Sequence, residues 1–297
     1  MKGIIVTGKS KDKFNSITKV IPKSLLPIHD KPMIYYPLSI LMNAEIKEIL
    51  VICNISEFPY YYKLLGYGDD LGIKIEYIED EEHNSVADAF IIGEDFIGSD
   101  DVALILGETI FYGHESSLII QQKSSPQKGA TIFASKDKNT NQFNITQNSF
   151  IKKITSEIGN SYGSQSSFSI PDLYFYDNRV VEIVKTLKLS QKGIVDITDI
   201  NNEYLKLNSL KIMSLGNEFL SLNTNTIESL AEATAFIKTI EKAQGRKIGC
   251  IEEIAFNMKY IDLNQLTLLA EPLLKSEYGQ YLINIGEKEL QYSNKPL

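Results

Sequence analysis

The chain has 297 residues, 43% of them apolar and 23% charged, and its formal net charge at pH 7 is −8. This balance is typical of a globular protein with a sizeable core, and the acidic surplus argues against nucleic acid as a partner, because phosphate neutralisation needs a basic surface. The two cysteines have no metal-binding or redox spacing and no apolar run reaches membrane-spanning length, so we expect a cytoplasmic protein with no membrane partner.

The first half of the chain alternates between strand-like and helix-like segments. Short apolar or alternating runs predict strands at residues 3–7, 48–55, 73–79 and 102–107. Apolar residues at helical spacing predict helices at residues 33–46, 60–68 and 85–98. This alternation predicts an α/β protein with a Rossmann-like, mostly parallel central sheet and helices on both faces. Ligands of such sheets lie beyond the carboxyl ends of the strands.

The second half is more mixed. Residues 123–169 are polar and alternate weakly, which predicts β-hairpins and a loop over the sheet. A strand and a helix are expected at 171–187, and a helix ending at Gly245 at 226–245. Residues 262–286 are expected to form two helices that are split near Pro272.

We divide the chain into an α/β core at residues 1–240 and a helical C-terminal oligomerisation region at 241–297, both parts of one compact unit.

Several stretches together carry a resemblance to a known family. They are SLLPIHDKPMIYYPLSILMNAEIKEIL, AFIIGEDFIG, IFYGHE, LYFYDNRVVE, DITDIN and CIEEIAF. In order and spacing they resemble bacterial glucose-1-phosphate thymidylyltransferases, nearly from end to end. The resemblance implies a nucleotidyltransferase (GT-A-like) fold with a β-rich insertion on the sugar side and a helical C-terminal region. It also implies a reaction in which a sugar phosphate attacks the α-phosphorus of a nucleoside triphosphate, with Mg²⁺ held by carboxylates.

The glycine-rich phosphate loop of that family is altered here. Gly8 is retained, but Lys9 and Lys11 replace glycines and Lys13 replaces the catalytic arginine, while Lys23 keeps the phosphate-contacting lysine. A Cβ penalises positive φ and occupies space that phosphates need, and lysine lacks the bidentate fork of arginine. We therefore expect a solvated basic surface at the loop in place of a triphosphate cradle.

The metal site that the resemblance implies is altered too. Gly107-Glu108 replaces the family's Gly-Asp, and Asn223 replaces its second metal aspartate. Mg²⁺ demands near-ideal octahedral geometry, so a longer carboxylate and a lost charge weaken this site. We expect no cofactor, or Mg²⁺ only if the protein is active.

The positions that the resemblance assigns to the base and the sugar have changed as well. Asp80 replaces a base-reading glutamine and Ser85 a glycine, while Asp196 shortens the sugar-contacting glutamate. An ionised aspartate accepts hydrogen bonds but cannot donate them, so Asp80 cannot pair with both edges of a pyrimidine.

A second group of retained residues corresponds to a regulatory nucleotide pocket in the family, near a subunit interface. It consists of Tyr112, Gly113, His114, Glu253 and Ile254. Retention for packing or oligomerisation is the expected explanation, and a ligand pocket is the alternative.

Because the changes gather in the active-site loops, the main hypothesis is a catalytically inactive family member, a pseudoenzyme. It would act as a ligand-binding or regulatory subunit in nucleotide-sugar metabolism, such as the dTDP-rhamnose pathway, or in surface-polysaccharide biosynthesis. It would form a homo-oligomer (dimer or tetramer), or pair with an active paralogue, and could bind a nucleotide or nucleotide-sugar. Two alternatives stay open: an active nucleotidyltransferase of altered specificity, and a purely structural oligomer partner.

Overall fold

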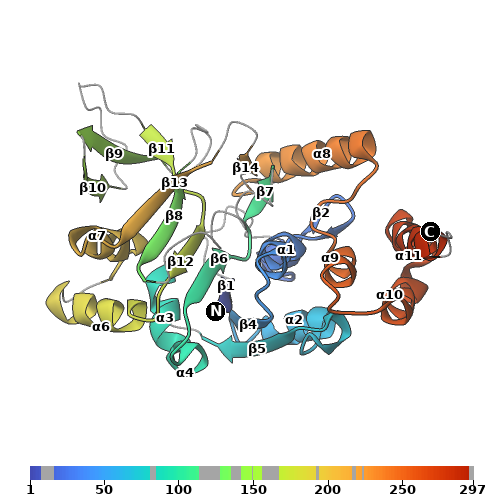
Figure 1. Cartoon of the computed structure of the whole chain (residues 1–297), viewed down its shortest axis with the longest axis horizontal. Coiled ribbons are helices and arrows are strands. Elements are labelled where there is room, and N and C mark those ends of the chain that lie inside the picture. Colours follow the sequence, from blue (N-terminus) through green and yellow to red (C-terminus); the bar gives the residue numbers. More distant parts are fainter. Residues whose placement is uncertain are drawn as a thin grey trace.

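A seven-stranded sheet organises the computed structural model, which describes residues 1–7, 17–80, 85–113, 128–134, 142–148, 150–155, 167–191, 194–215, 219–222 and 224–293 (Figure 1). The strands of this sheet are β1 (Lys2–Val6), β4 (Glu48–Cys53), β5 (Lys74–Glu79), β6 (Val102–Leu106), β8 (Ala130–Ala134), β12 (Leu173–Tyr176) and β13 (Leu210–Ser214). Their order is β13-β8-β12-β6-β1-β4-β5. β12 runs antiparallel to both neighbours, and every other pairing in the sheet is parallel, which confirms the mostly parallel sheet.

Alternate residues of the central strands enter two separate cores, because side chains of a strand point to opposite faces. Ile5 packs into the core beneath one face, and its neighbour Ile4 packs into the core beneath the other. Both are fully buried, which explains why these strands are continuous apolar runs in the sequence.

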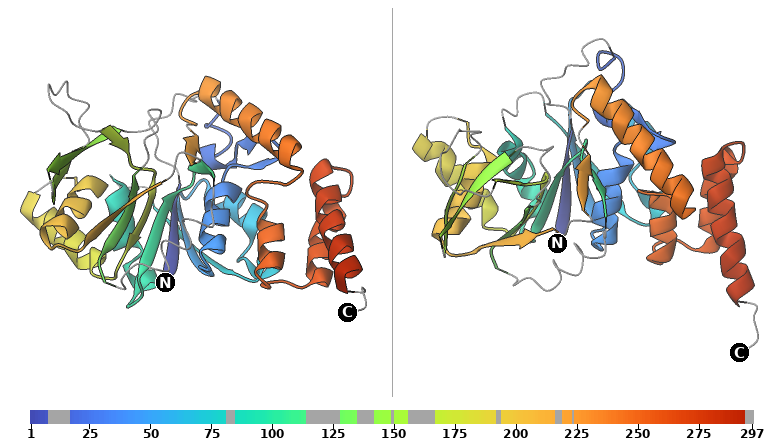
Figure 2. Two further views of the ribbon diagram at one scale, coloured as in Figure 1. Left: turned by 45° about the horizontal axis from the view of Figure 1, so that its top comes forward. Right: turned by 90° about the horizontal axis from the view of Figure 1, so that it is seen from above.

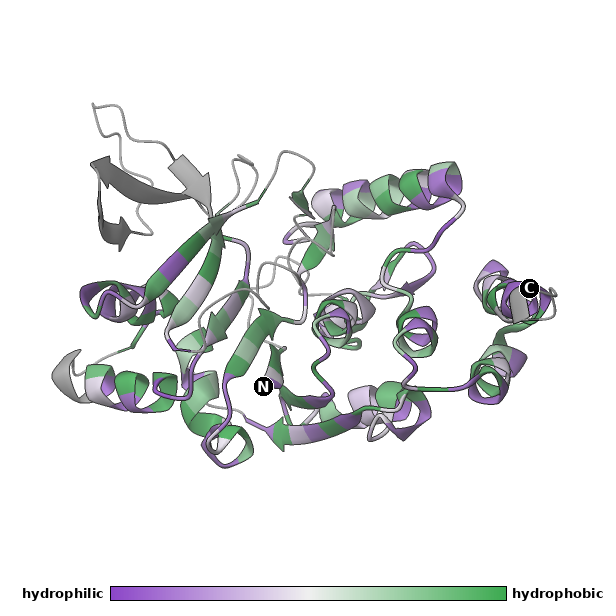
Figure 3. Ribbon diagram, in the orientation of Figure 1, coloured by the Kyte–Doolittle hydropathy of each residue, from purple (hydrophilic) through white to green (hydrophobic). Residues whose placement is uncertain are grey.

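Helices cover both faces of the sheet. They are α1 (Tyr35–Asn43), α2 (Phe58–Leu65), α3 (Ala89–Ile92), α4 (Glu94–Ile97), α6 (Val180–Gln191), α7 (Ile197–Lys206), α8 (Ile227–Gln244), α9 (Ile251–Asn257), α10 (Leu263–Ala270) and α11 (Glu277–Ser293). α3, α4, α6 and α7 lie on one side, and α1, α2 and α9 lie on the other (Figure 1). Their apolar faces turn inward and their polar faces outward (Figure 3).

The helix that we predicted at residues 85–98 is interrupted. A 3₁₀ turn, η3 (Val86–Asp88), is followed by α3 and α4, which are separated by Gly93. A Cβ at Gly93 would lie 3.0 Å from Leu50 Cδ2 and 3.2 Å from Ile4 Cδ1. The glycine therefore lets the backbone pack closely on β1 and β4, and the predicted helical segment stops at its glycines, Gly93 and Gly98.

Smaller sheets and turns complete the fold. They are β2 (Pro27–Ile28) with β3 (Lys31–Pro32), β7 (Ile110–Tyr112) with β14 (Leu220–Leu222), and β9 (Gln142–Asn148), β10 (Phe150–Thr155) and β11 (Ser167–Ser169). Further 3₁₀ turns are η1 (Lys23–Leu25), η2 (Asp69–Leu71) and η4 (Glu271–Leu273). The antiparallel β9–β10 pair confirms a hairpin in the polar segment.

The C-terminal region is helical, as predicted. α8 is capped by Thr226, whose side chain accepts from Ser229 N–H, and ends at Gly245 in the left-handed region. α10 and α11 are separated by η4, which contains Pro272. They stand at one end of the molecule (Figure 2). α8 extends past residue 240, and the division of the chain at that residue stays a prediction. Within the described ranges, no helix is both long and apolar enough to span a bilayer.

Candidate active site

A buried lysine and a carboxylate meet at the carboxyl end of β6. Lys23 begins η1 and is 6% exposed, and its Nζ forms an ion pair with the carboxylate of Glu108. The same Nζ donates to Asn225 Oδ1 at 3.0 Å. Three segments that are far apart in the sequence therefore meet where a parallel sheet binds its ligands.

The turn that carries Glu108 is tightly held. Gly107 N–H donates to the Val6 carbonyl at 2.8 Å, and Thr224 Oγ1 donates to the Glu108 carbonyl at 3.2 Å. A Cβ at Gly107 would lie 2.8 Å from Thr7 Cγ2, closer than real Cβ atoms come. Gly107 therefore lets the end of β6 lie directly against β1, and this contact positions the backbone of Glu108.

A second carboxyl group lies at the same end of β6 and was missed in the sequence. Leu173 pairs with Ile105, and Leu106 N–H donates to the Asp172 carbonyl at 3.3 Å. Burial raises the pKa of Asp172 to about 6, and the negative charge of Glu108 adds to the rise. Only the antiparallel pairing of β12 with β6 reveals this position, which belongs to none of the stretches on which the resemblance rests.

Asp196 and Ser85 have structural roles that are visible in the fold. Asp196 is the N-cap of α7 and accepts from Thr198 N–H at 2.9 Å. Ser85 caps η3, and its N–H donates to Asp88 Oδ2 at 3.1 Å. The side-chain cap accounts for Asp196 locally, whereas Ser85 Oγ makes no hydrogen bond among the described residues. Whether either residue also contacts a ligand stays a prediction.

The base-reading position lies farther along the sheet edge. Asp80 directly follows β5, is half-buried, and donates its N–H to the Cys53 carbonyl at 2.9 Å. It therefore lies at the carboxyl end of β5, on the side of the sheet where the phosphate and metal positions also lie.

A separate cavity of about 700 Å³ brings together four of the five residues that we assigned to the regulatory pocket. Tyr112, Gly113, Glu253 and Ile254 all line it, together with Arg246. Tyr112 Oη accepts from Gln244 Nε2 at 2.9 Å, and Tyr281 Oη donates to Glu253 Oε2 at 2.8 Å. Burial raises the pKa of Glu253. Packing and ligand binding therefore both stay possible roles for these residues. Arg246 adds a positive charge to the cavity and was not among the predicted site residues.

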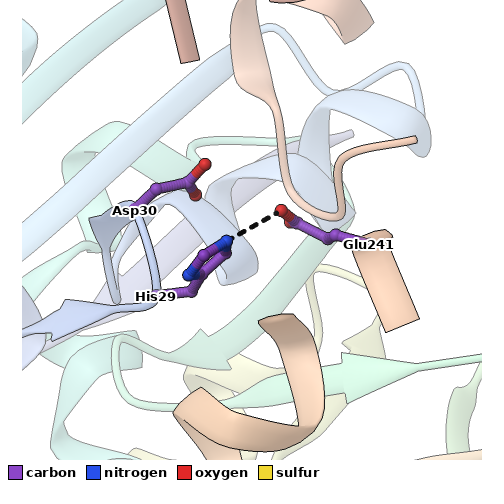
Figure 4. Close-up of side chains that lie close together, drawn as sticks. All are labelled: His29, Asp30 and Glu241. Carbon is purple, nitrogen blue, oxygen red and sulfur yellow. Dashed lines mark ion pairs between the residues drawn. The ribbon is translucent and has the colours of Figure 1, made fainter. Parts of the chain in front are cut away.

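His29, Asp30 and Glu241 form a third cluster, in which the His29 imidazole and the Glu241 carboxylate face each other (Figure 4). His29 Nε2 lies 3.7 Å from Glu241 Oε2. Two lysines already neutralise the carboxylates: Lys31 lies 2.6 Å from Asp30 and 2.8 Å from Glu241, and Lys247 pairs with both. Two ammonium groups would repel a metal ion, so we read this cluster as an ion network that ties α8 to the β2–β3 hairpin.

The family model described as "Nucleotidyl transferase" matches residues 2–240. This chain belongs to the nucleotidyl transferase family. It is 42% identical to a glucose-1-phosphate thymidylyltransferase of Neisseria meningitidis, and the match covers 97% of this chain and 100% of that enzyme. It is 39% identical to the enzyme of that name from Mycolicibacterium smegmatis, and the match covers 97% of this chain and 100% of that enzyme.

Solved structures show the same nucleotidyltransferase fold. A crystal structure of a candidate glucose-1-phosphate thymidylyltransferase from Bacillus anthracis, in complex with a sucrose, is 30% identical, with a TM-score of 0.71. The match covers 80% of this chain and 94% of that one. A UDP-glucose pyrophosphorylase complexed with UDP-glucose is 17% identical, with a TM-score of 0.67 over 80% of this chain and 98% of that one, and supports the fold alone.

Of the predicted site residues, the structure brings Lys23, Gly107 and Glu108 together at the carboxyl end of β6. Six other predicted residues lie outside the described part of the chain: Gly8, Lys9, Lys11, Lys13, His114 and Asn223. Their assignments stay predictions.

The carboxylates that the structure describes fit a divalent cation. Glu108 and Asp172 both offer hard oxygen ligands, and the negative charge of Glu108 contributes to the raised pKa of Asp172. Lys23 pairs with Glu108 and must be displaced before a cation can bind there. Once Lys23 has moved away, the carboxylate of Glu108 is a suitable ligand for Mg²⁺.

Proposed function

We propose that this chain is a sugar-1-phosphate nucleotidyltransferase of the thymidylyltransferase type. It would convert a nucleoside triphosphate and a sugar 1-phosphate into a nucleoside-diphosphate sugar and pyrophosphate. The ion pair of Lys23 with Glu108 at the carboxyl end of β6 carries the proposal, in a chain that is 42% identical to a named transferase over nearly its whole length. The altered motifs led us to expect an inactive protein. The relatives of this name support an active nucleotidyltransferase instead.

In the proposed reaction, an oxygen of the sugar 1-phosphate attacks the α-phosphorus of the triphosphate and forms a new P–O bond. The bond from the α-phosphorus to the bridging oxygen breaks, and its electron pair leaves on pyrophosphate. Lys23 Nζ, once released from Glu108, donates to phosphate oxygens and stabilises the developing charge. Glu108 would hold Mg²⁺, which when bound neutralises the triphosphate.

The substituted positions predict a slow enzyme with altered base specificity. Lys9 and Lys11 place side chains where the family has glycines, and Lys13 is a weaker phosphate clamp than arginine. Asp80 cannot donate to a base as glutamine does. Loss of one such preorganised contact costs about a hundredfold in rate, so several together predict turnover well below that of an unsubstituted enzyme.

Binding without turnover is the second candidate function. It is favoured by those same substitutions and by the pairing of Lys23, which a ligand must displace from Glu108. Such a protein would regulate or accompany an active transferase, and the cavity lined by Tyr112 and Glu253 would be one place for a nucleotide ligand. A homo-oligomer and a purely structural role also stay predictions.

One pair of experiments separates these candidates. Pyrophosphate release is measured with glucose 1-phosphate, Mg²⁺ or Mn²⁺ and each nucleoside triphosphate in turn, and isothermal titration calorimetry measures nucleotide binding. Turnover supports the transferase, and binding without turnover supports the regulatory protein. A protein that neither binds nor turns over any of these compounds is a structural partner.

A further inference from the structure

Asn225 contacts the lysine that the proposed reaction uses to bind phosphate. It lies in the turn between β14 and α8, and its side chain is exposed. Its Oδ1 accepts from Lys23 Nζ at 3.0 Å, across 202 residues of sequence. An ammonium group only donates, so the amide atom that faces Nζ must be the oxygen. Lys23 therefore has a neutral acceptor as well as the carboxylate of Glu108.

The backbone is held in place on both sides of Asn225. Thr224 is 3% exposed, and its Oγ1 donates to the Glu108 carbonyl at 3.2 Å. Thr226 is the N-cap of α8, and its Oγ1 accepts from a backbone N–H of the first helical turn at 3.1 Å. Between these two anchors only the side chain of Asn225 is free to turn. Its amide oxygen therefore meets Lys23 at a small cost in conformational entropy.

Lys23 is held at its backbone as well. Its carbonyl accepts from Leu26 N–H at 3.0 Å, and the Oγ of the next residue, Ser24, lies 2.5 Å from Tyr61 Oη. Lys23 is also buried, so its long side chain enters the site from a fixed point. The partners of Nζ then decide where its N–H bonds point, because the ammonium group is otherwise a freely rotating donor.

A bound substrate would affect the two partners of Nζ differently. Glu108 is the residue that we expect to hold Mg²⁺, and a metal ion bound there separates this carboxylate from Lys23. Asn225 carries no charge, so it attracts a cation far less than a carboxylate does and stays on Lys23. An ammonium group has three N–H bonds. With one of them fixed by Asn225, the other two are left for phosphate oxygens in defined directions.

We propose that Asn225 is a positioning residue that orients Lys23 Nζ toward the phosphates of the nucleoside triphosphate. It acts on the substrate through Lys23. The inference rests on the proposed function, in which Lys23 binds phosphate. A hydrogen bond to a charged group contributes enough that its loss predicts about a tenfold weaker affinity for a polyphosphate.

The test compares two substitutions of Asn225 in the full chain. Asn225→Leu removes the acceptor and nearly keeps the size of the side chain, and Asn225→Gln keeps an amide oxygen on a longer side chain. Isothermal titration calorimetry with inorganic tripolyphosphate and Mg²⁺ measures phosphate binding without any contribution from base or sugar. Asn225→Leu should bind about tenfold more weakly than the wild type, and Asn225→Gln should stay within about threefold of it.

Asn178→Leu is the matched control. Asn178 is likewise exposed, but it lies two residues after the end of β12, where Tyr176 pairs with Val102 at the amino end of β6. This variant should bind tripolyphosphate as the wild type does. The kcat/KM for pyrophosphate release should follow the same order as the affinities.

A wild type that does not bind tripolyphosphate would overturn the proposal, and this result depends on no variant. Equal affinities of the wild type and Asn225→Leu would overturn it too. If Asn225→Gln binds as weakly as Asn225→Leu, the turn matters and the amide oxygen does not, so the proposal is wrong.

Turnover is scored separately from binding. A loss of affinity in Asn225→Leu, with no pyrophosphate release by the wild type, overturns the proposed transferase and leaves this inference standing. Pyrophosphate release by the wild type, with unchanged affinity in Asn225→Leu, does the reverse.

Discussion

Replacement of Glu241 by glutamine should destabilise the protein more than any ordinary surface substitution. The Glu241 side chain is 4% exposed and pairs with Lys31, which is 1% exposed, at 2.8 Å. It also accepts from Ile248 N–H at 2.8 Å. Removing one partner of a buried ion pair costs about 3–5 kcal/mol, because the other charge stays buried.

The lower end of this range applies here. Lys31 keeps Asp30 at 2.6 Å, and a glutamine oxygen can still accept from Ile248 N–H. We therefore expect Glu241→Gln to lower the free energy of unfolding by about 3 kcal/mol. The assay is urea unfolding followed by far-ultraviolet circular dichroism, since the chain contains no tryptophan for fluorescence.

A matched control tests the reasoning. Glu203 forms an ion pair with Lys206 at 2.8 Å, but Lys206 is 70% exposed, so Glu203→Gln should cost less than about 0.5 kcal/mol. If both glutamine variants lose the same small amount, burial of the network does not govern its energy and the argument fails. The double variant Lys31→Met/Glu241→Gln removes both charges, keeps an acceptor for Ile248 N–H and should recover part of the loss.

Two further predictions concern the turn at the site and the pH range of stability. Gly107→Ala should lower the free energy of unfolding by about 1–3 kcal/mol, because the added Cβ would contact Thr7 Cγ2. Thr7→Ser removes that methyl group and should restore most of the lost stability. If urea unfolding shows no rescue in the double variant, this explanation is wrong. Burial alone would raise the pKa of Asp177, but hydrogen bonds from Arg179, Tyr204 and the backbone hold it below its usual value. A lowered carboxyl pKa stabilises the fold above the unfolded-state pKa of about 4, and this stabilisation is lost as the pH falls further. The stability gap between wild type and Asp177→Asn should therefore shrink below about pH 4 in thermal unfolding, and a gap that is constant with pH would refute the assignment.

The sequence predicted those features that depend on local pattern. The buried strands and α8, with its Thr226 cap and Gly245 terminus, follow from apolar periodicity and capping. It did not predict that the Gly93 backbone lies close to β1 and β4, because that approach is a tertiary contact.

The candidate site divides in the same way. Lys23 and Glu108 were identified by their place in recognisable stretches, although the ion pair between them joins segments that are 85 residues apart. Asp172 was not identified, since its position depends on the antiparallel pairing of β12 with β6, and no local pattern encodes that pairing. The altered loop positions led to an expectation of inactivity, and that expectation has no support from the named relatives.

The most direct test of the account is product formation from dTTP, glucose 1-phosphate and Mg²⁺, with the nucleoside-diphosphate sugar and pyrophosphate both quantified. We predict that the two products form in equal amounts and that Glu108→Gln lowers the rate by about a hundredfold. The control is Glu203→Gln, whose ion-pair partner Lys206 is 70% exposed, and it should leave the rate unchanged. Absence of both products with dTTP and with every other nucleoside triphosphate, from a protein that is folded by circular dichroism, would contradict the proposed transferase.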